Sequence, residues 1–299
     1  MKKHPVLFGF LIFSAVALLF YAFIFGMFSL LGRAKKSDSF ALFEPSVGVI
    51  EINGVIESSD RIAKSIREFV EDDQIKGILV RIDSPGGMVA PVQEIHRELL
   101  RAREAKPVFA SLGGAAASGG YYIACAAETI VSNPGTMTGS IGVIMEFISG
   151  EKAFQMLGLT NQVVKSGKFK DTGNIARGLS EDERRVLQET VDDVFRQFVD
   201  AVSEGRNLDQ ESVLKVADGR VLSGAQAKDV GLVDELGSFY DTLDLLKEKL
   251  RVEGKVRLIY PKEPESNLFE YLINGISGRI KDALIKESNV TPTGRLFFR

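Results

Sequence analysis

Apolar and polar positions along the chain divide residues 46–262 into short strands and longer helices. The expected strands lie at 47–56 (a strand pair or one bent strand), 76–83, 107–113, 128–133 and 140–145. Between them, residues 58–72 and about 91–105 carry apolar side chains at helical spacing, the first behind a serine or aspartate cap. Strands that alternate with helices of this length predict an α/β fold with a mostly parallel sheet.

The two ends of the chain differ from this central pattern. A tail at 1–4 precedes residues 5–32, which are almost wholly apolar and have basic residues on both sides. The apolar run is long enough to cross a bilayer as one helix, and no small-residue cleavage site follows it, so we predict an uncleaved transmembrane anchor. The basic residues on the two sides of the run are nearly balanced, so charge alone does not predict which end of the anchor faces the cytoplasm. A linker at 33–45 leads to the domain, and 263–299 are expected to form an amphipathic helix and a polar tail without chemistry.

The composition narrows the chemistry that a site could use. The 299 residues have a formal net charge of -3, which does not favour a nucleic-acid partner, and the single cysteine, Cys125, excludes an intramolecular disulfide. With only two histidines, His4 and His96, a zinc site is disfavoured, and no metal or cofactor is expected. A Ser-His-Asp triad would have to use His96, which lies within a strongly helical pattern. A serine nucleophile in this chain therefore predicts a lysine base.

One serine stands in a stretch suited to nucleophilic chemistry. Ser118 lies in GGAAASGGYY, between a predicted strand and helical residues 121–127. Small neighbours let a substrate approach closely, and the free amides at a helix N-terminus can stabilise a developing negative oxygen. An ordinary helix cap is the alternative interpretation of Ser118.

A second glycine-containing loop follows the predicted strand at 76–83. Its sequence, SPGG, lies at the carboxyl end of that strand, where open α/β sheets bind their ligands. The glycines allow backbone amides to point outward, so Gly86 or Gly87 could form an oxyanion hole together with the amide of Gly119. A substrate is expected to dock there in extended form, with its apolar side chains in shallow pockets.

Three lysines are candidates for the base. Lys165, Lys168 and Lys170 lie in KSGKFKD, and the base among them must lose its charge, which requires burial. Asp171 would oppose that change unless it points away from the base. The spacing of the three lysines does not choose among them.

Four motifs together resemble one known family. The sequences SPGG, AASGGYYIA, NPGTMTGSIGVIM and KSGKFKD, in this order behind an N-terminal anchor, resemble the short form of the signal peptide peptidases of the SppA type. The similarity runs from about Val47 to Leu246. It implies a ClpP/crotonase-like fold with repeated ββα units and a Ser-Lys dyad that hydrolyses signal peptides left in the membrane, as well as other short or unfolded polypeptides.

The resemblance also assigns residues and surroundings. It implies that Ser118 is the nucleophile, that Lys170 is the general base, and that Ser140 orients the lysine. It implies a single-pass protein of the cell (inner) membrane, with its catalytic domain on the extracytoplasmic side, and a homo-oligomeric ring whose sites are completed across subunits. Asn174 and Ile175 replace the Ser-Pro that many relatives have at this position, which affects only the local shape of the loop.

Three other classes of protein remain as alternatives. A crotonase-fold acyl-CoA enzyme would share the fold and the paired amides, but it would need neither an anchor nor a serine at the turn. A membrane Ser-Lys protease of the stomatin-associated type usually has further membrane segments, and the hydropathy pattern predicts none after residue 31. A non-catalytic scaffold would be expected to lack Ser118 and Lys170.

Overall fold

The computed structural model describes residues 18–25, 45–262 and 296–298. The chain divides into two compact units, Met1–Pro45 and Ser46–Arg299, which are considered separately. Most of the anchor and linker predicted at 5–32 and 33–45 lies outside the described residues. Residues 18–25 are helical with exposed side chains. Among the helices that the structure describes, none is both long and apolar enough to cross a membrane.

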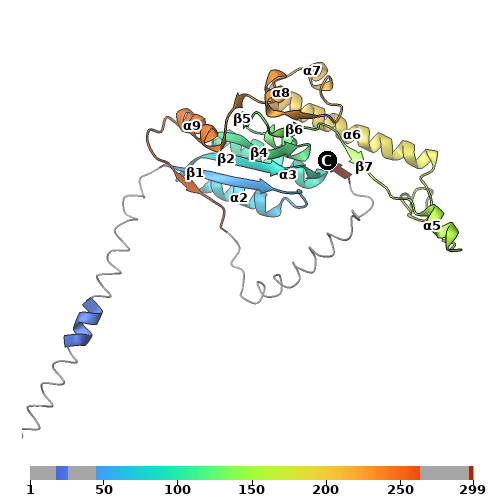
Figure 1. The fold of residues 1–299 in the computed structure, drawn as a ribbon, viewed down its shortest axis with the longest axis horizontal. Helices are drawn as coiled ribbons and strands as arrows, with labels where there is room; N and C mark the ends of the chain where they lie inside the picture. Colours follow the sequence, from blue (N-terminus) through green and yellow to red (C-terminus); the bar gives the residue numbers. More distant parts are fainter. Residues whose placement is uncertain (1–17, 26–44, 263–295, 299) are drawn as a thin grey trace, which may run out of the picture. The chain divides into compact units, whose positions relative to one another are not determined.

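The second unit is an α/β domain, as the alternating pattern predicts (Figure 1). Its strands are β1 (Ser46–Asn53), β2 (Ile75–Ser84), β3 (Gly87–Met88), β4 (Val108–Ala117), β5 (Thr129–Ser132), β6 (Met137–Gly139), β7 (Ile144–Met145), β8 (Val221–Ser223), β9 (Glu235–Leu236), β10 (Arg257–Ile259) and β11 (Leu296–Phe298). Its helices are α2 (Asp60–Glu71), α3 (Val89–Ala105), α4 (Gly119–Ala124), α5 (Glu151–Met156), α6 (Glu181–Arg206), α7 (Gln210–Leu214), α8 (Gly224–Asp229) and α9 (Phe239–Leu250).

The main sheet is mostly parallel. Its strand order is β10-β1-β2-β4-β5-β9, and each neighbouring pair in this path is parallel. Strand β6 adds to the carboxyl end of β4 in parallel, and β8 pairs with β6 in the antiparallel direction. The carboxyl ends of β2 and β4 are therefore adjacent, which brings the SPGG loop and the Ser118 turn to the same edge of the sheet.

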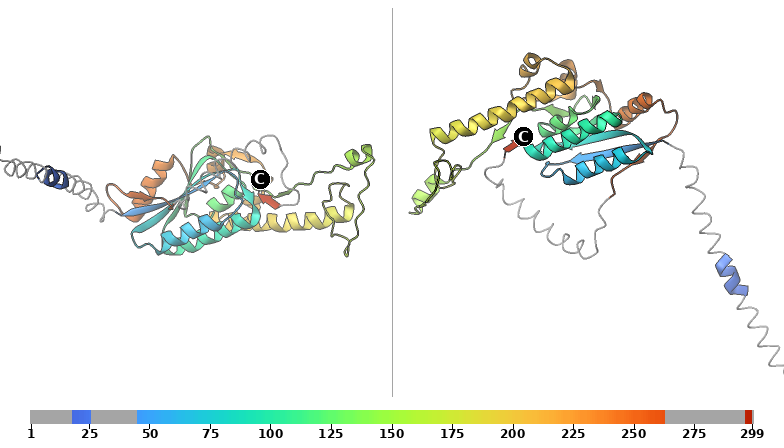
Figure 2. Two further views of the ribbon diagram at one scale, coloured as in Figure 1. Left: turned by 90° about the horizontal axis from the view of Figure 1, so that it is seen from below. Right: turned by 180° about the vertical axis from the view of Figure 1, so that it is seen from behind.

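Side chains of the central strands alternate between two apolar layers. In β2, Ile78, Val80 and Ile82 belong to the larger core, whereas Leu79 belongs to a smaller core on the opposite face. Helices α2 and α3 cover the first face and α9 covers the second (Figures 1 and 2). Leu79 is fully buried under α9, so β2 is covered on both faces. Its sequence is therefore a continuous apolar run and does not alternate between apolar and polar residues.

Most expected strands are present, and one is wrong in its extent. Strands β2, β4 and β5 lie where the sequence predicts them, and the run at 47–56 forms one strand, β1, followed by a bridge from Ile56 to Gly87. The run at 140–145 is not one strand: β6 ends at Gly139, and β7 begins only at Ile144. Ser140 has a φ of 51°, in the left-handed region, which turns the backbone away from an extended path.

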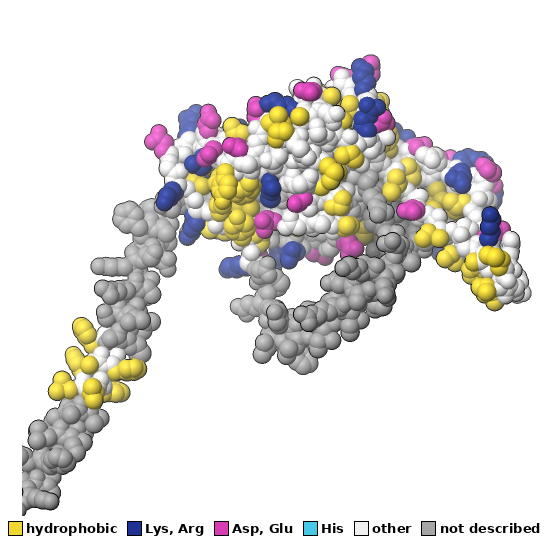
Figure 3. Space-filling model, viewed as in Figure 1, with side chains coloured by type: hydrophobic (Ala, Val, Ile, Leu, Met, Phe, Trp, Pro, Cys, Tyr) yellow, Lys and Arg dark blue, Asp and Glu magenta, His cyan; other side chains and the backbone are white. Residues whose placement is uncertain are grey.

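A segment that we call the arm, residues 144–180, projects away from the sheet (Figures 1 and 2). It contains β7, α5 and the KSGKFKD loop, and it ends at the capping box of α6, in which Ser180 and Glu183 bond each other's backbone. Hydrophobic side chains gather on its outer surface (Figure 3). The large exposed apolar residues of the arm are Ile144, Ile148, Met156, Leu157, Leu159, Val163, Val164, Phe169 and Ile175.

The described part of the chain's last segment is a strand. We expected a helix and a polar tail over 263–299, and most of that range lies outside the described residues. For residues 296–298 the expectation is wrong, because β11 pairs antiparallel with β3 on one side and with β7 on the other. Phe298 is fully buried in the larger core, so an apolar side chain decides the conformation of this short stretch.

Candidate active site

Ser118 occupies a strained turn between β4 and α4. Its φ of 52° and ψ of -116° lie outside the regions that most residues adopt. Backbone hydrogen bonds hold this conformation: the Ser118 N–H donates to the Gly139 carbonyl at 2.8 Å, and the Ser118 carbonyl accepts from the Tyr122 N–H at 2.8 Å. The β4–β6 ladder and the first turn of α4 therefore fix the position of the serine together.

The Ser118 hydroxyl has no partner among the described residues. Its side chain is 0% exposed, and the Oγ atom makes no hydrogen bond with the described chain. A buried hydroxyl without a partner is unfavourable by about 1–3 kcal/mol. Strain and an unsatisfied polar atom at one residue are features of functional sites rather than of helix caps.

The two predicted oxyanion loops meet beside Ser118. Gly86 has a φ of +111°, and a Cβ added to it would lie 2.9 Å from the Gly119 amide nitrogen. A Cβ added to Gly119 would lie 3.2 Å from the Gly87 amide nitrogen. These close approaches leave no room for side chains, so the glycines allow the backbone amides of the two loops to converge.

Ser140 lies next to the same turn. Gly139, its neighbour, pairs with Ala117 in the β4–β6 ladder and accepts the hydrogen bond from Ser118. The Ser140 N–H donates to the Arg220 carbonyl at 2.8 Å, and its side chain is buried. The structure thus brings Ser140 to the Ser118 turn, while its role in orienting a lysine stays a prediction.

Lys170 lies elsewhere in the chain. It belongs to the exposed loop of the arm, which projects away from the junction of β4 and α4 (Figure 1). Its ammonium makes neither a hydrogen bond nor an ion pair with the residues that the structure describes. A single chain therefore does not bring Lys170 to Ser118.

The other two lysines of the loop are held in ion pairs. Lys165 binds Asp171, and Lys168 binds Asp182. Asp171 also accepts a contact from Arg177 at 3.1 Å. The hydrogen bond from Lys165, followed by that from Arg177, lowers the pKa of Asp171, whose carboxylate is thus engaged away from Lys170. We expected the Asp171 carboxylate to keep the base lysine charged unless it pointed away from it. In the structure this carboxylate pairs with Lys165 and Arg177 instead.

His96 and Cys125 are packed residues. The His96 ring contacts the edge of Tyr122 with a centroid distance of 4.9 Å. Burial, with smaller contributions from Arg103 and Arg97, lowers the pKa of His96 to about 4, so the ring is neutral near pH 7. Burial also raises the pKa of the Cys125 thiol to about 12. Because the Ser118 hydroxyl bonds neither group, His96 does not complete a triad in this structure.

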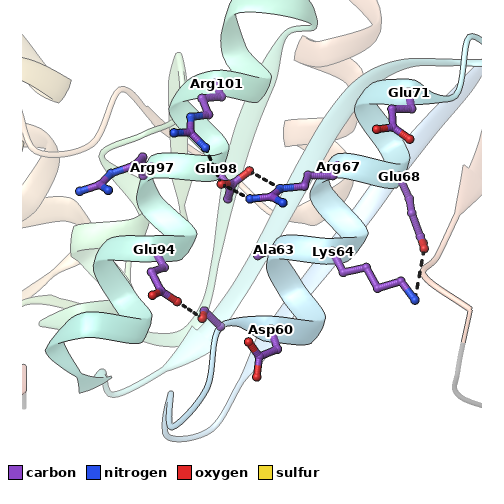
Figure 4. A pocket seen from close by; sticks show the side chains of 11 residues that line it. Asp60, Ala63, Lys64, Arg67, Glu68, Glu71, Glu94, Arg97, Glu98 and Arg101 are labelled. Carbon is purple, nitrogen blue, oxygen red and sulfur yellow. Dashed lines mark hydrogen bonds and ion pairs between the residues drawn. The ribbon is translucent and has the colours of Figure 1, made fainter.

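A separate charged groove of about 560 Å³ lies between α2 and α3 (Figure 4). Its ionic groups mostly bind one another: Glu98 accepts from both Arg67 and Arg101 at 2.8 Å. Ser59 donates to Glu94 across the same gap. These contacts join the two helices, and none of the residues that line the groove belongs to the predicted catalytic set.

Comparisons with known proteins identify the family of the chain. The family model described as Peptidase family S49 matches residues 101–253, which include Ser118, Ser140 and Lys170. A Synechocystis protein named "Putative protease" is 44% identical over 64% of this chain and 70% of its own length. The chain belongs to peptidase family S49. It is a serine peptidase by that membership.

Two further relatives carry more specific names. An Enterococcus faecium protein named "Putative signal peptide peptidase SppA" is 35% identical over 71% of this chain and 62% of its own length. "Protease 4" of Salmonella typhi is 32% identical over 80% of this chain and only 40% of its own length. Among solved structures, a ClpP1 variant of Listeria monocytogenes matches 65% of this chain and 94% of its own, with a TM-score of 0.45 and 21% identity.

Sequence reasoning missed one feature of the candidate site, an aromatic cluster beside the Ser118 turn and the SPGG loop. Phe298 of β11 stacks on Tyr122 and contacts the edge of Phe198, with centroid distances of 5.0 Å and 4.8 Å. The only signal in the sequence was a pair of adjacent phenylalanines, 297 and 298, in a segment that we expected to be a polar tail. Nothing in the spacing links that pair to Tyr122.

Proposed function

We propose that this S49 peptidase is a membrane-anchored endopeptidase that degrades cleaved signal peptides and other short or unfolded polypeptides with a Ser-Lys dyad. Ser118 is the nucleophile and Lys170 is the general base. The name of the Enterococcus relative supports the choice of signal peptides as substrates. The fold proposed for the domain is the ClpP/crotonase-like one.

The observation that carries this proposal is the state of Ser118. Its strained backbone presents an unpaired hydroxyl beside the amides of Gly87 and Gly119. A serine that served only as a helix cap would accept a hydrogen bond from the first turn of α4, and the Ser118 side chain accepts none. Nucleophilic attack explains both the strain and the missing partner.

The reaction follows from these groups. Neutral Lys170 takes the Ser118 proton as Oγ attacks the substrate carbonyl, and the amides of Gly119 and of Gly86 or Gly87 stabilise the oxyanion. The peptide C–N bond then breaks, and the lysine gives the proton to the leaving amine. Water next hydrolyses the ester on Ser118, which restores the hydroxyl and releases the carboxylate product.

Lys170 reaches a serine in this proposal through assembly of several chains. The arm carries exposed apolar side chains together with Lys170, a combination that suits a surface buried against a neighbouring subunit. At the neighbour's Ser118 turn the amine would lose its contact with water, which favours its neutral form. A homo-oligomeric ring of heterologous contacts would complete every site in the same way.

The anchor defines where the enzyme acts. We propose that residues 5–32 hold the protein in the cell (inner) membrane with a single span, and that the catalytic domain lies on the extracytoplasmic side. The apolar length of this run supports a span. Among the alternatives, a crotonase-type acyl-CoA enzyme gives no reason for the strained Ser118. A stomatin-associated type of protease usually has further membrane segments, and the hydropathy pattern predicts none after residue 31.

The experiment that tests the proposal compares the full chain with Ser118→Ala. We expect the substitution to lower kcat/KM for peptide hydrolysis by at least about 10³-fold and to abolish labelling by a fluorophosphonate probe. Thermal stability should change little, because the hydroxyl makes no hydrogen bond with the described residues. Equal hydrolysis by a pure Ser118→Ala preparation would refute the assignment of the nucleophile.

A further inference from the structure

The side chain of Ser84, the first residue of the SPGG loop, folds back onto that loop. Ser84 is 0% exposed. Its Oγ accepts a hydrogen bond from the Gly86 N–H at 3.1 Å, in a turn where a serine hydroxyl takes the place of a backbone carbonyl. The hydroxyl also donates to the Gly86 carbonyl, at a longer 3.4 Å. The amide of Gly86 is therefore occupied within its own loop.

Backbone bonds to Ile56 fix the direction of the amide that follows. The Gly86 carbonyl accepts from the Ile56 N–H at 2.9 Å, and the Met88 N–H donates to the Ile56 carbonyl at 2.8 Å. Amides of successive residues in an extended chain point to opposite sides, so the N–H of Gly87, between these two bonds, points away from Ile56. A Cβ built on Gly119 would lie 3.2 Å from the Gly87 nitrogen. The Gly87 amide is thus the loop donor that lies against the first residue of α4.

Ser84 also contacts the elements on both sides of the nucleophile. A Cβ built on Gly120 of α4 would lie 2.8 Å from the Ser84 carbonyl oxygen and 3.5 Å from the Ser84 Cβ. In the β2–β4 ladder Ser84 pairs with Ala116, after an irregularity in the register that follows Ile82. One buried residue thus joins the SPGG loop to the strand that leads to Ser118 and to the helix that follows it.

The conformation of the SPGG loop needs such a support. Gly86 has a φ of +111°, which glycine adopts readily but also leaves readily. Pro85 has no N–H, so the Gly86 N–H is the first amide of the loop that a side chain can hold. Loss of the Ser84 hydroxyl would let the peptide plane between Pro85 and Gly86 rotate, and the Gly87 amide would turn with it.

We propose that Ser84 is a positioning residue for hydrolysis at Ser118. Its hydroxyl occupies the Gly86 amide, and Gly87 is thereby the residue of the SPGG loop that donates to the oxyanion, beside Gly119. This inference rests on the proposed peptidase function and deepens it, because it decides between the two loop glycines. The oxyanion forms only after the substrate has bound, so a misplaced donor slows the chemical step and leaves binding nearly unchanged.

The test compares full-length Ser84→Ala and Ser84→Cys with the wild type in hydrolysis of a fluorogenic peptide. Ser84→Ala should lower kcat by about 10–100-fold and change KM by less than about threefold. This loss is smaller than the loss of about 10²–10³-fold for removal of an oxyanion donor, because the donor is displaced and not deleted. Ser84→Cys should lose nearly as much, because its thiol fills the same space but is a weak acceptor.

Ser132→Ala is the matched control for the loss of a buried hydroxyl. Ser132 of β5 is 0% exposed, and its Oγ donates to the Asn133 carbonyl at 3.0 Å, away from the SPGG loop. Its replacement should lower thermal stability by an amount similar to that for Ser84→Ala, because each removes one buried hydrogen bond. It should nevertheless keep kcat within about threefold of the wild type.

Two inhibitors distinguish positioning from a general loss of structure. Ser118 Oγ adds to the carbonyl carbon of a peptide aldehyde, its proton passes to the base, and the former carbonyl oxygen becomes the oxyanion. The corresponding peptide alcohol cannot form this adduct. Ser84→Ala should raise the inhibition constant of the aldehyde by about 10–100-fold and that of the alcohol by less than about threefold.

The outcomes separate failure of this inference from failure of the proposed function. If hydrolysis depends on Ser118, three results would each overturn the role of Ser84 alone: equal kcat in Ser84→Ala and Ser132→Ala, full activity in Ser84→Cys, or equal changes for the two inhibitors. Hydrolysis that persists in Ser118→Ala would overturn the proposed function, and the role of Ser84 with it. A low kcat in both Ser84 variants, with unchanged KM and selectively weaker aldehyde inhibition, would support both.

Discussion

Different kinds of interaction hold the Ser118 turn and the arm in their conformations. Around Ser118, backbone hydrogen bonds and buried small residues fix the chain, and the Gly113–Gly120 stretch carries no charged side chain. In the arm, order comes from charged side chains: Arg177 binds both Glu183 and Asp171, and Lys165 binds Asp171. One region is rigid and covered, and the other is held by ionic contacts at the surface.

This difference suits the two tasks that the proposed mechanism requires. A nucleophile and its oxyanion donors must be placed to a fraction of an ångström, which a sheet and a helix N-terminus can do within one chain. A base supplied to a neighbouring chain must instead be presented on a surface that is complementary to that neighbour. The position of Lys170 in an exposed arm is consistent with the second task.

Replacement of Lys170 should have the largest effect on kcat/KM among the changes that test this difference. Lys170→Ala and Lys170→Arg should each lower kcat/KM by about 10²–10⁴-fold, because arginine stays protonated and cannot serve as a base. Lys168→Ala, which removes only a surface ion pair with Asp182, should stay within about threefold of the wild type. Peptide hydrolysis under identical conditions measures all three variants. Near-normal turnover by Lys170→Arg would transfer the role of base to another lysine.

A mixture of two inactive variants tests whether each dyad combines residues from two chains. If each site combines Ser118 of one chain with Lys170 of a neighbour, co-assembled Ser118→Ala and Lys170→Ala chains should regain about a quarter of the wild-type sites by random mixing. Two preparations of Lys170→Ala mixed with each other provide the control. A mixture that forms hetero-oligomers by native mass spectrometry and stays inactive would show that the dyad forms within one chain.

Phe198→Ala tests how strongly the region around Ser118 depends on packing. Phe198 is fully buried and contacts the rings of Tyr122 and Phe298. The variant should lower the free energy of unfolding by about 3–5 kcal/mol, because it leaves a cavity in the larger core. Phe195→Ala, on the same helix but only partly buried, should lower it less. Urea unfolding of the two variants and the wild type is the measurement, and equal losses for both variants would contradict the expectation.

As the pH falls, the arm should lose stability at a higher pH than the sheet does. Hydrogen bonds from Arg177 and from the Ser180 backbone lower the pKa of Glu183, and Lys165 lowers that of Asp171. A depressed carboxyl pKa stabilises the folded state above the ordinary values of 4.5 and 3.8, and this contribution is lost as the pH falls through the lowered pKa values. Protection from hydrogen exchange at 165–180, relative to the intrinsic exchange rate at each pH, should therefore fall between pH 5 and about pH 3 more than protection at 108–117. Glu183→Gln should weaken this pH dependence, and an equal loss of protection in both regions would contradict it.

The smallest effect is expected at His96. Because its ring is neutral and packed on Tyr122, His96→Gln should change kcat/KM by less than about threefold and leave the pH profile between 6 and 8 unaltered. The measurement is the pH dependence of peptide hydrolysis for the two proteins. Loss of an ionisation near pH 6.5 in the variant would indicate that His96 takes part in catalysis.

The sequence predicts the centre of the fold better than its edges. Strands β2 and β4 are long, apolar runs, so pattern alone locates them and thereby the two loops that follow them. Strand β6 has only Met137, Thr138 and Gly139, and its pairing with β4 depends on tertiary contacts that no local pattern reports. The left-handed conformation of Ser140 is likewise set by its neighbours rather than by its residue type.

The sequence likewise predicts some residues of the candidate site and not others. Ser118 and the glycines could be located from residue types and their order, because each loop follows a recognisable strand. The choice of Lys170 came from a motif. The structure shows ion pairs at Lys165 and Lys168, and the role of Lys170 stays a prediction. The contact of Phe298 with Tyr122 could not be predicted, because 175 residues separate the two and their pairing depends on the folded surface.

The single cysteine offers a chemical route into the arm. Cys125 is buried and its thiol pKa is raised to about 12, so alkylating reagents at neutral pH should leave it unmodified in the folded protein. A cysteine introduced by Lys170→Cys would then be the one reactive thiol, and bromoethylamine would convert it to a thioether analogue of lysine. The side chain at this one position could thus be installed, removed or varied in length on protein that is already folded, without further changes to the chain.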